Sequence, residues 1–500
     1  MIGEGTARSA ARTGWGKLRD LRAWIAQCDR GALLIVVLFV LLLPLSNPRV
    51  ALSDEVQYYA YLRSVYFDGD LDFRNEYEHF AQAGLRNRDP AVFNALLRTD
   101  AANPNPVTGK LRNVAPVGSA LMWSPGYILA DIGVRAARLL GVEVAADGYS
   151  RPYIWAACFM SALYALLGLL LTYRLARRFS GAFAATLATV AIWLATPLIF
   201  YSTIAMPWSH ATAFFLFALF LTVWLRGWDG QLEDRTARRS PMNWVSLGII
   251  GGLMTITREQ LGLLMIIPAV EGLDAYARLL RGRRWGEMRS LLIGHVLLVV
   301  AFAVALIPQL VAYQVLNGSP RPSSTVSGKL NLVSWHFFGT LFDARHGAFL
   351  WSPILLIGLI GLIWLMRRDR MLAALLLLGF VAQTYINGAF GTTWHLSGSF
   401  GFRRLIECTP IFVLGLASLI ERLRIRTGRW PLVLAAVLLI YWNVGLIAQW
   451  TVVRKEMRRG LIWEEMLYYQ AVEVPRQVIG RFDDLLFNRC GMMTNCARDG

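Results

Sequence analysis

Charged residues are scarce in this chain of 500 residues: Asp, Glu, Lys and Arg make up 17% of it, whereas a soluble domain carries about 25%. Hydrophobic residues make up 56%, and the mean hydropathy is +0.44. This composition excludes a soluble globular protein and predicts an all-α polytopic membrane protein. Lys and Arg exceed Asp and Glu to give a net charge of +17. No nucleic-acid-binding motif accompanies this charge, so we expect no nucleic-acid partner.

Cysteine is also scarce, and its spacing matches no metal site. Only Cys490 and Cys496 of the five cysteines lie close together. We predict that they face an oxidising compartment and form a disulfide, with free thiols as the alternative. Asp68, Asp70 and Asp72 are compatible with a divalent cation, but a solvated turn is the interpretation we favour. The sequence therefore predicts no certain cofactor and no metal site.

Hydrophobic segments of membrane-spanning length recur along the chain. A spanning helix needs roughly 20 apolar residues, and we predict about eleven such segments. They are residues 31–47, 152–173, 182–202, 209–226, 243–257, 260–277, 290–316, 347–366, 371–388, 403–420 and 430–450. The first is short enough for a signal-peptide core, but no cleavage site follows it, so we interpret it as a retained signal-anchor.

Basic residues alternate between the connections of these segments. The tail of residues 1–30 is basic, and so is every second loop after it. Because basic loops stay in the cytoplasm, the remaining loops are expected to face outward. This predicts a cytoplasmic tail (1–30), a transmembrane module (31–450) and an outward C-terminal tail (451–500). Two outward loops of the module are large, at residues 48–150 and 317–346.

Two adjacent carboxylates, Asp54 and Glu55, follow the first hydrophobic segment. Acidic residues at a membrane edge are costly unless they are solvated or paired. The apolar spacing after them predicts an interfacial helix from Asp54 to Phe67, with Ser53 or Asp54 as its N-cap. From the residues alone, the pair is either catalytic or merely a cap and a first-turn acid.

Several motifs resemble the GT-C superfamily of polytopic glycosyltransferases, in particular family-39-like members such as the protein O-mannosyltransferases and the lipid A aminoarabinose transferases. They are S-D-E-x-x-Y-Y at 53–59, D-G-D-L at 68–71, N-V-x-P-x-G-x-A-L-x-W-x-P at 113–125, and the segment 394–410. The resemblance implies an inverting transfer of a sugar from a polyprenyl-phosphate donor to a lipid, glycan or protein acceptor. It places this reaction at the outer face of a bacterial cytoplasmic membrane, among membrane lipids, with Asp54 as the catalytic base and Glu55 supporting it.

One departure from the family concerns the phosphate. A Lys-Pro-Pro segment whose lysine meets the lipid phosphate in several members is replaced here by N-V-A-P-V-G. We therefore expect the donor phosphate to bind cations elsewhere, because guanidinium groups bind phosphate bidentately. The candidates are Lys110, Arg112, Arg258, Arg403 and Arg404.

Aromatic and polar side chains in the outward connections are candidates for the sugar or acceptor site. They are Tyr58, Tyr59, Trp208, His210, His336, His346, Trp394, His395 and Glu407. Structural alternatives stay open: Trp208 as a membrane anchor, Arg258 paired with Glu259, and Glu407 paired with Arg403 or Arg404. For the loop with His336 and His346 we favour substrate gating over a zinc site. A flippase or transporter of lipid-linked sugars, or a surface-glycan polymerase or ligase, is the alternative function.

Overall fold

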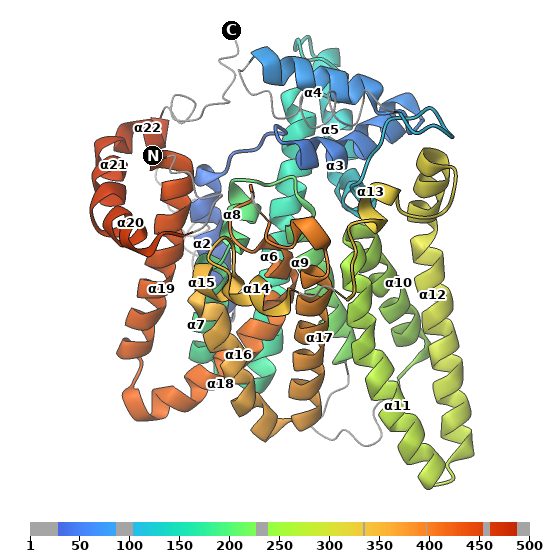
Figure 1. Cartoon of the computed structure of the whole chain (residues 1–500), viewed down its shortest axis with the longest axis vertical. Helices are drawn as coiled ribbons and strands as arrows, with labels where there is room; N and C mark the ends of the chain where they lie inside the picture. Colours follow the sequence, from blue (N-terminus) through green and yellow to red (C-terminus); the bar gives the residue numbers. More distant parts are fainter. Residues whose placement is uncertain are drawn as a thin grey trace, which may run out of the picture.

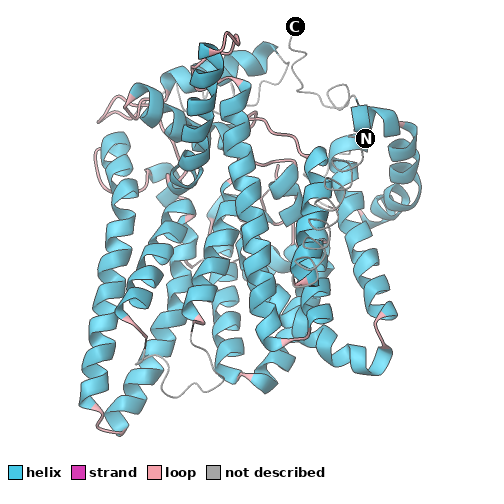
Figure 2. Ribbon diagram, turned by 180° about the vertical axis from the view of Figure 1, so that it is seen from behind, coloured by secondary structure: helices cyan, strands magenta, loops and turns pink. Residues whose placement is uncertain are grey.

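The computed structural model describes residues 29–86, 104–226, 239–333, 336–396, 398–453 and 461–487. The predictions for the basic tail before residue 29 and for Cys490 and Cys496 fall outside these ranges. Throughout the described ranges the chain forms helices joined by loops, and no strand occurs there (Figure 2).

Helices account for all regular structure of the described chain. In chain order the α-helices are α2 (Arg30–Leu42), α3 (Ser53–Arg63), α4 (Arg74–Arg86), α5 (Gly118–Leu139), α6 (Arg151–Phe179), α7 (Ala182–Leu194), α8 (Leu198–Thr203), α9 (Ser209–Trp224), α10 (Pro241–Thr257), α11 (Ile266–Arg281), α12 (Trp285–Asn317), α13 (Ser324–Ser327), α14 (Phe337–Phe342), α15 (Ala348–Trp351), α16 (Pro353–Arg368), α17 (Arg370–Gly388), α18 (Thr409–Thr427), α19 (Trp430–Ala448), α20 (Trp463–Tyr468), α21 (Val474–Gly480) and α22 (Phe482–Phe487). Short 3-10 and π turns interrupt or extend them: η1 (Leu43–Leu45), η2 (Ser64–Asp68), η4 (Glu259–Met265), η5 (Gly391–Thr393), η6 (Arg403–Cys408), η7 (Gln449–Val453) and η8 (Tyr469–Glu473).

Every hydrophobic segment predicted from the sequence contains a helix. Four helices of the described chain are long and apolar enough to cross a membrane: α6, α12, α17 and the continuous stretch Trp430–Thr451. The apolar stretch Arg30–Leu45 and helices α7 and α9 are shorter. The predicted all-α membrane protein is therefore confirmed, whereas the count of about eleven spans stays a prediction.

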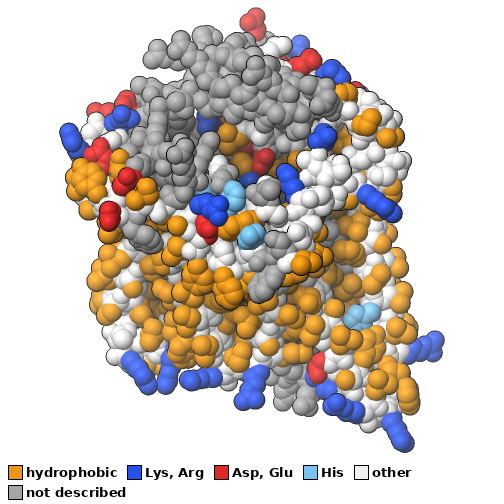
Figure 3. Space-filling model, in the orientation of Figure 1, with side chains coloured by type: hydrophobic (Ala, Val, Ile, Leu, Met, Phe, Trp, Pro, Cys, Tyr) orange, Lys and Arg blue, Asp and Glu red, His pale blue; other side chains and the backbone are white. Residues whose placement is uncertain are grey.

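The two ends of the bundle differ in composition. Helices α3, α4 and α13 lie at one end, here called the upper end, while the turns that join α11 to α12 and α18 to α19 lie at the other (Figure 1). Side chains of both charges and several His gather toward the upper end, an apolar belt follows, and Lys and Arg line the lower edge (Figure 3). This order of layers is the one expected of a body that crosses a bilayer.

The upper end has its own aromatic core, which fixes α3. The Tyr59 hydroxyl donates to the carbonyl of Gly148 at 2.5 Å, and the Tyr127 hydroxyl donates to the same carbonyl at 3.1 Å. Gly148 has a φ of +79°, and a Cβ there would meet the Tyr127 hydroxyl at 2.6 Å, so a larger residue is excluded. Because α3 is held by its neighbours, its first turn is a rigid platform.

Candidate active site

Glu55 caps the start of α3. Its Oε2 accepts hydrogen bonds from the backbone N–H groups of Ala51, at 2.8 Å, and Leu52, at 2.9 Å. Its Oε1 accepts one from the indole N–H of Trp208 at 2.9 Å. Burial raises the pKa of Glu55, and the backbone hydrogen bonds oppose that rise. The predicted cap, Ser53 or Asp54, is therefore wrong: Glu55 binds the free N–H groups, and the N-cap position is Leu52.

Asp54 is left free to face solvent, because its neighbour supplies the cap. Both terminal nitrogens of Arg403 lie 3.2 Å from its Oδ2. The Asp54 side chain is 41% exposed, whereas that of Arg403 is only 17% exposed. The helix predicted from Asp54 to Phe67 is confirmed as α3 and η2, whereas its position at the membrane interface stays a prediction. Its first turn thus presents one carboxylate to a guanidinium that is 349 positions away in the chain.

Asp54 and Arg403 line a cavity of about 500 Å³ at the upper end, the Asp54 cavity. One wall comes from the first turn of α3, and another from the loop before η6, which contributes His395. Lys329 and Arg404 add two further cations. The loop bends sharply, with positive φ at Leu396 (+54°) and Gly398 (+90°), a conformation that L-residues seldom adopt.

Two aromatic rings hold the arginines of this cavity. The guanidinium carbon of Arg403 lies 4.0 Å from the ring centre of Trp208, and that of Arg404 lies 4.8 Å from the ring centre of Phe390. Stacking of this kind fixes a cation without neutralising it. The buried Arg403 Nε and Arg404 Nη1 have no hydrogen-bond partner in the described chain. Both nitrogens are therefore buried donors that lack an acceptor in the described chain.

A second set of predicted residues forms a buried ionic cluster next to the cavity. The Glu407 Oε1 lies 2.8 Å from Arg258 Nε and 2.8 Å from His210 Nδ1. Arg258 also donates to the Ser209 hydroxyl at 3.1 Å, and that hydroxyl lies 2.9 Å from the Tyr58 hydroxyl.

The partner of Glu407 therefore differs from our expectation. Its ion pair is made with Arg258, whereas we expected Arg403 or Arg404. Glu259, the alternative partner for Arg258, accepts a hydrogen bond from Tyr313. Glu407 forms an ion pair with Arg258, and Asp54 forms one with Arg403. Of the three arginines, Arg404 is therefore the one whose charge neither of these two carboxylates neutralises.

Two predicted phosphate ligands lie elsewhere. Lys110 Nζ is 3.8 Å from Asp72 Oδ2 and lines a different cavity. Arg112 donates to the Thr325 hydroxyl at 2.5 Å and does not line the Asp54 cavity. Tyr59 is committed to the aromatic core. The structure thus brings Asp54, Arg403, Arg404, Trp208 and His395 together but separates them from these three.

The predicted histidine loop forms a stacked cluster. His336 lies on Trp394 with ring centres 4.4 Å apart, and the Arg345 guanidinium lies 4.9 Å from the same ring. His346 stacks on Trp351 at 5.2 Å, and burial lowers its pKa to about 4, so it is neutral at physiological pH. Among the described residues, no group of three or more His, Cys, Asp or Glu side chains is placed to hold a metal ion.

Sequence reasoning missed three polar contributors to these sites: Lys329, Thr393 and Ser209. Lys329 is an isolated cation in the predicted outward loop 317–346, and this position was an available signal. Ser209 adjoins His210 in the M-P-W-S-H motif. Thr393, which accepts a 3.4 Å hydrogen bond from Arg404, carries no sequence signal that distinguishes it.

Comparison with solved structures finds a likeness that extends over most of the chain. No protein-family model matches the chain, and no curated protein sequence does. Among solved structures, it is similar to the crystal structure of ArnT from Cupriavidus metallidurans in the apo state. The match covers 97% of this chain and 74% of that chain, with 18% sequence identity and a TM-score of 0.46. A likeness at this level carries no argument about activity.

Proposed function

We propose that this protein is a membrane glycosyltransferase that moves a sugar from a polyprenyl-phosphate donor to an acceptor hydroxyl. One observation carries the proposal: Asp54, Arg403 and Arg404 line a single cavity at the polar end of an apolar helical bundle. A carboxylate suits deprotonation of a hydroxyl, and guanidinium groups suit a lipid phosphate. The transfer of a lipid-linked sugar needs both at headgroup depth.

The electrostatics of the cavity favour an anionic donor. Three arginines, Arg258, Arg403 and Arg404, are opposed in these contacts by the carboxylates of Asp54 and Glu407. Lys329 adds a further cation at the wall. A phosphate would use the free Nε of Arg403 and the free Nη1 of Arg404, so that buried donors without partners acquire acceptors.

The chemistry follows from this arrangement. Asp54 accepts the proton of the acceptor hydroxyl while that oxygen attacks the anomeric carbon from the face opposite the phosphate. The bond between that carbon and the phosphate oxygen breaks, and its electron pair stays on the phosphate. Arg403 and Arg404 stabilise the developing negative charge. The product carries an inverted anomeric centre, and polyprenyl phosphate leaves.

Arg403 couples the two halves of the site. Its terminal nitrogens contact the Asp54 carboxylate, the group that accepts the proton. A donor phosphate competes for the same guanidinium and loosens this ion pair. Asp54 is therefore released from this ion pair when the leaving group is already bound.

The basic lower edge supports a reaction on the outer side of the membrane. Lys and Arg line the end opposite the cavity (Figure 3), and such residues favour the cytoplasmic side. The Asp54 cavity then faces outward from a cytoplasmic membrane. The acceptor is a lipid, a glycan or a protein, and the arginines neutralise the phosphate without requiring a divalent cation.

Transfer assays with defined variants test the proposal. The purified full-length protein, reconstituted in nanodiscs, is incubated with radiolabelled polyprenyl-phosphate sugars and a membrane extract as acceptor source. We expect label to move for the natural protein and for Asp483→Asn, a matched change at an exposed carboxylate of α22. We expect transfer by Asp54→Asn to fall by about 10²- to 10⁴-fold.

Two outcomes would overturn this function. Transfer by Asp54→Asn at the natural rate would exclude Asp54 as the base. Absence of transfer from every donor, together with protein-dependent movement of the labelled lipids between leaflets, would instead support a flippase.

A further inference from the structure

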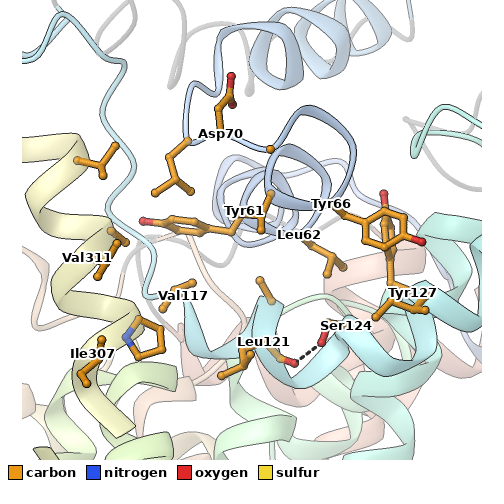
Figure 4. Close-up of a pocket in the computed structure, with 18 of the residues that line it drawn as sticks. Tyr61, Leu62, Tyr66, Asp70, Val117, Leu121, Ser124, Tyr127, Ile307 and Val311 are labelled. Atoms are coloured by element: carbon orange, nitrogen blue, oxygen red, sulfur yellow. Dashed lines mark hydrogen bonds between the residues drawn. The ribbon is translucent and has the colours of Figure 1, made fainter. Parts of the chain in front are cut away.

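A second cavity of the upper end is apolar and lies apart from the Asp54 cavity. It has a volume of about 790 Å³ and is lined by α3, η2, α5 and α12, including Leu121, Val311 and Tyr61. Figure 4 shows α5 below this space, α12 beside it, and the Tyr61 ring across its roof. We call it the α5–α12 groove. Its volume is typical of ligand sites, which measure about 300–1,000 Å³.

The groove opens onto the surface that faces the bilayer. Val311 on α12 is 51% exposed, and Leu121 on α5 is 44% exposed. The helix α12 is one of the four long enough to cross a membrane, so its exposed apolar face contacts hydrocarbon. A lipid chain would enter the groove from the bilayer without crossing water.

A polar end closes the groove at headgroup level. Asp70 lies at its top (Figure 4), and Lys110 also lines it, 3.8 Å from Asp72. The backbone N–H of Asp72 donates to Asp70 and keeps its pKa below the usual value, so Asp70 is ionised at neutral pH. One cation and two anions therefore stand together beside an apolar space.

Tyr61 provides a second observation, independent of the charged residues, that points to a bound ligand. The residue is 1% exposed, and its hydroxyl has no hydrogen-bond partner in the described chain. Its ring crosses the roof of the groove with the hydroxyl directed toward α12 (Figure 4). A buried hydroxyl without a partner is costly, and an acceptor oxygen of a bound molecule would remove that cost.

We propose that the α5–α12 groove binds a phospholipid whose headgroup carries a primary ammonium, such as phosphatidylethanolamine. An acyl chain lies along Leu121 and Val311, Lys110 and the Tyr61 hydroxyl bind the phosphate, and Asp70 and Asp72 bind the ammonium. Charge complementarity selects this headgroup, because a lipid whose headgroup carries only a phosphate would leave the carboxylates of Asp70 and Asp72 without a cationic partner on the lipid. The lipid is not the glycosyl donor, because no described residue lines both cavities.

A lipid in the groove would contact helix α3. Tyr61, Leu62, Val65 and Tyr66 of its second half line the groove, while Asp54 in its first turn lines the other cavity. A bound lipid would brace the helix that carries the proposed base. Lipid binding in the groove does not require the proposed transferase activity.

Native mass spectrometry of the delipidated full-length protein tests the proposal, with phosphatidylethanolamine, phosphatidylcholine and phosphatidylglycerol as separate probes. We expect one tightly bound phosphatidylethanolamine and at least about tenfold weaker binding of phosphatidylcholine, whose quaternary ammonium donates no hydrogen bond. Val311→Trp fills the groove and should abolish tight binding. Val300→Trp is the matched control, since Val300 is 56% exposed on α12 but does not line the groove.

Tyr61→Phe keeps the packing and removes only the hydroxyl. It should weaken phosphatidylethanolamine binding by about 3- to 10-fold. Asp70→Asn removes a carboxylate that binds the ammonium, so it should reduce the ratio of the affinity for phosphatidylethanolamine to the affinity for phosphatidylglycerol. Equal binding to the natural protein and Val311→Trp would overturn the site. Preferred binding of phosphatidylglycerol would overturn the headgroup assignment, and displacement by polyprenyl phosphate at lower concentration would assign the groove to the donor.

These readouts are separate from sugar transfer. An inactive protein that still binds phosphatidylethanolamine would contradict the proposed function alone, while an active protein with an empty groove would contradict this inference alone.

Discussion

Two cavities at the same end of the bundle differ in almost every property that decides what they bind. The Asp54 cavity combines a carboxylate, two arginines and a lysine in about 500 Å³. The α5–α12 groove is larger, about 790 Å³, and apolar except at its upper end. Both use residues of α3, and neither shares a lining residue with the other. One helix, α3, therefore lies between a charged cavity and an apolar groove.

The change Asp54→Asn should have the largest effect on activity. The amide keeps the shape of the side chain but cannot accept the hydroxyl proton, so transfer should fall by about 10²- to 10⁴-fold. Donor binding should persist, because the arginines stay in place. Initial rates and equilibrium binding of polyprenyl phosphate, measured on the same preparation, check both statements; a parallel loss of binding would assign Asp54 to the donor site instead.

Arg403→Gln should have the next largest effect, on the binding of the donor. It removes the guanidinium that stacks on Trp208 and contacts Asp54, which should raise the KM for donor by about 10- to 100-fold. Lys110→Gln removes a cation of the groove and should leave this KM unchanged. The reverse order of effects would move the phosphate from the Asp54 cavity to the groove.

Glu407→Gln should affect stability more than either cavity change. It leaves Arg258 buried without its charge partner, and breaking a buried ion pair typically costs about 3–5 kcal/mol. A marked fall in the thermal midpoint of the protein in detergent is therefore expected. A midpoint within one degree or so of the natural protein would mean that Arg258 is solvated or held by other groups.

Glu55→Gln separates the two neighbouring carboxylates. The amide retains one acceptor oxygen but loses the charge-assisted hydrogen bonds to two backbone N–H groups and Trp208. We expect a stability loss of about 1–3 kcal/mol and a smaller loss of transfer than for Asp54→Asn. Inactivity equal to that of Asp54→Asn, in a protein of normal stability, would make Glu55 a catalytic group.

The stability of the protein should also depend on pH through Glu76 on α4, which accepts a hydrogen bond from Arg63 of α3 at 3.0 Å. Burial raises its pKa to about 7, above the ordinary value of 4.5. The folded state therefore holds this proton more tightly, and stability should fall as pH rises from about 4.5 to about 7 and then level off. Thermal midpoints between pH 5 and pH 8 should show a shallower decline for Glu76→Gln; an identical decline would exclude Glu76 as its source.

Local patterns in the sequence predicted much of the fold and part of the site. Apolar length predicted helices at each hydrophobic segment, and helical spacing predicted α3. The cap was assigned wrongly because Asp54 and Glu55 are both suitable by type, and only the bend of the chain at Leu52 brings the backbone N–H groups to Glu55. The partner of Glu407 was missed for a similar reason: Arg258 is distant in sequence, and only helix packing brings the two together.

The cations of the site were predicted only in part from the sequence. The alternation of basic loops predicted that the arginines of the site lie in connections that face outward. Which of them meet Asp54 was not readable, because Lys110 and Arg403 carry the same signal. The path of the chain around Lys110 places this lysine in the lining of the α5–α12 groove and not in that of the Asp54 cavity.

The most direct test of the central claim is an experimental structure of the full-length protein with polyprenyl phosphate bound. We predict that the phosphate lies in the Asp54 cavity, within hydrogen-bond distance of Arg403 and Arg404, with the contact between Arg403 and Asp54 lengthened. A phosphate bound at Lys110 in the α5–α12 groove, with Arg403 still on Asp54, would contradict it.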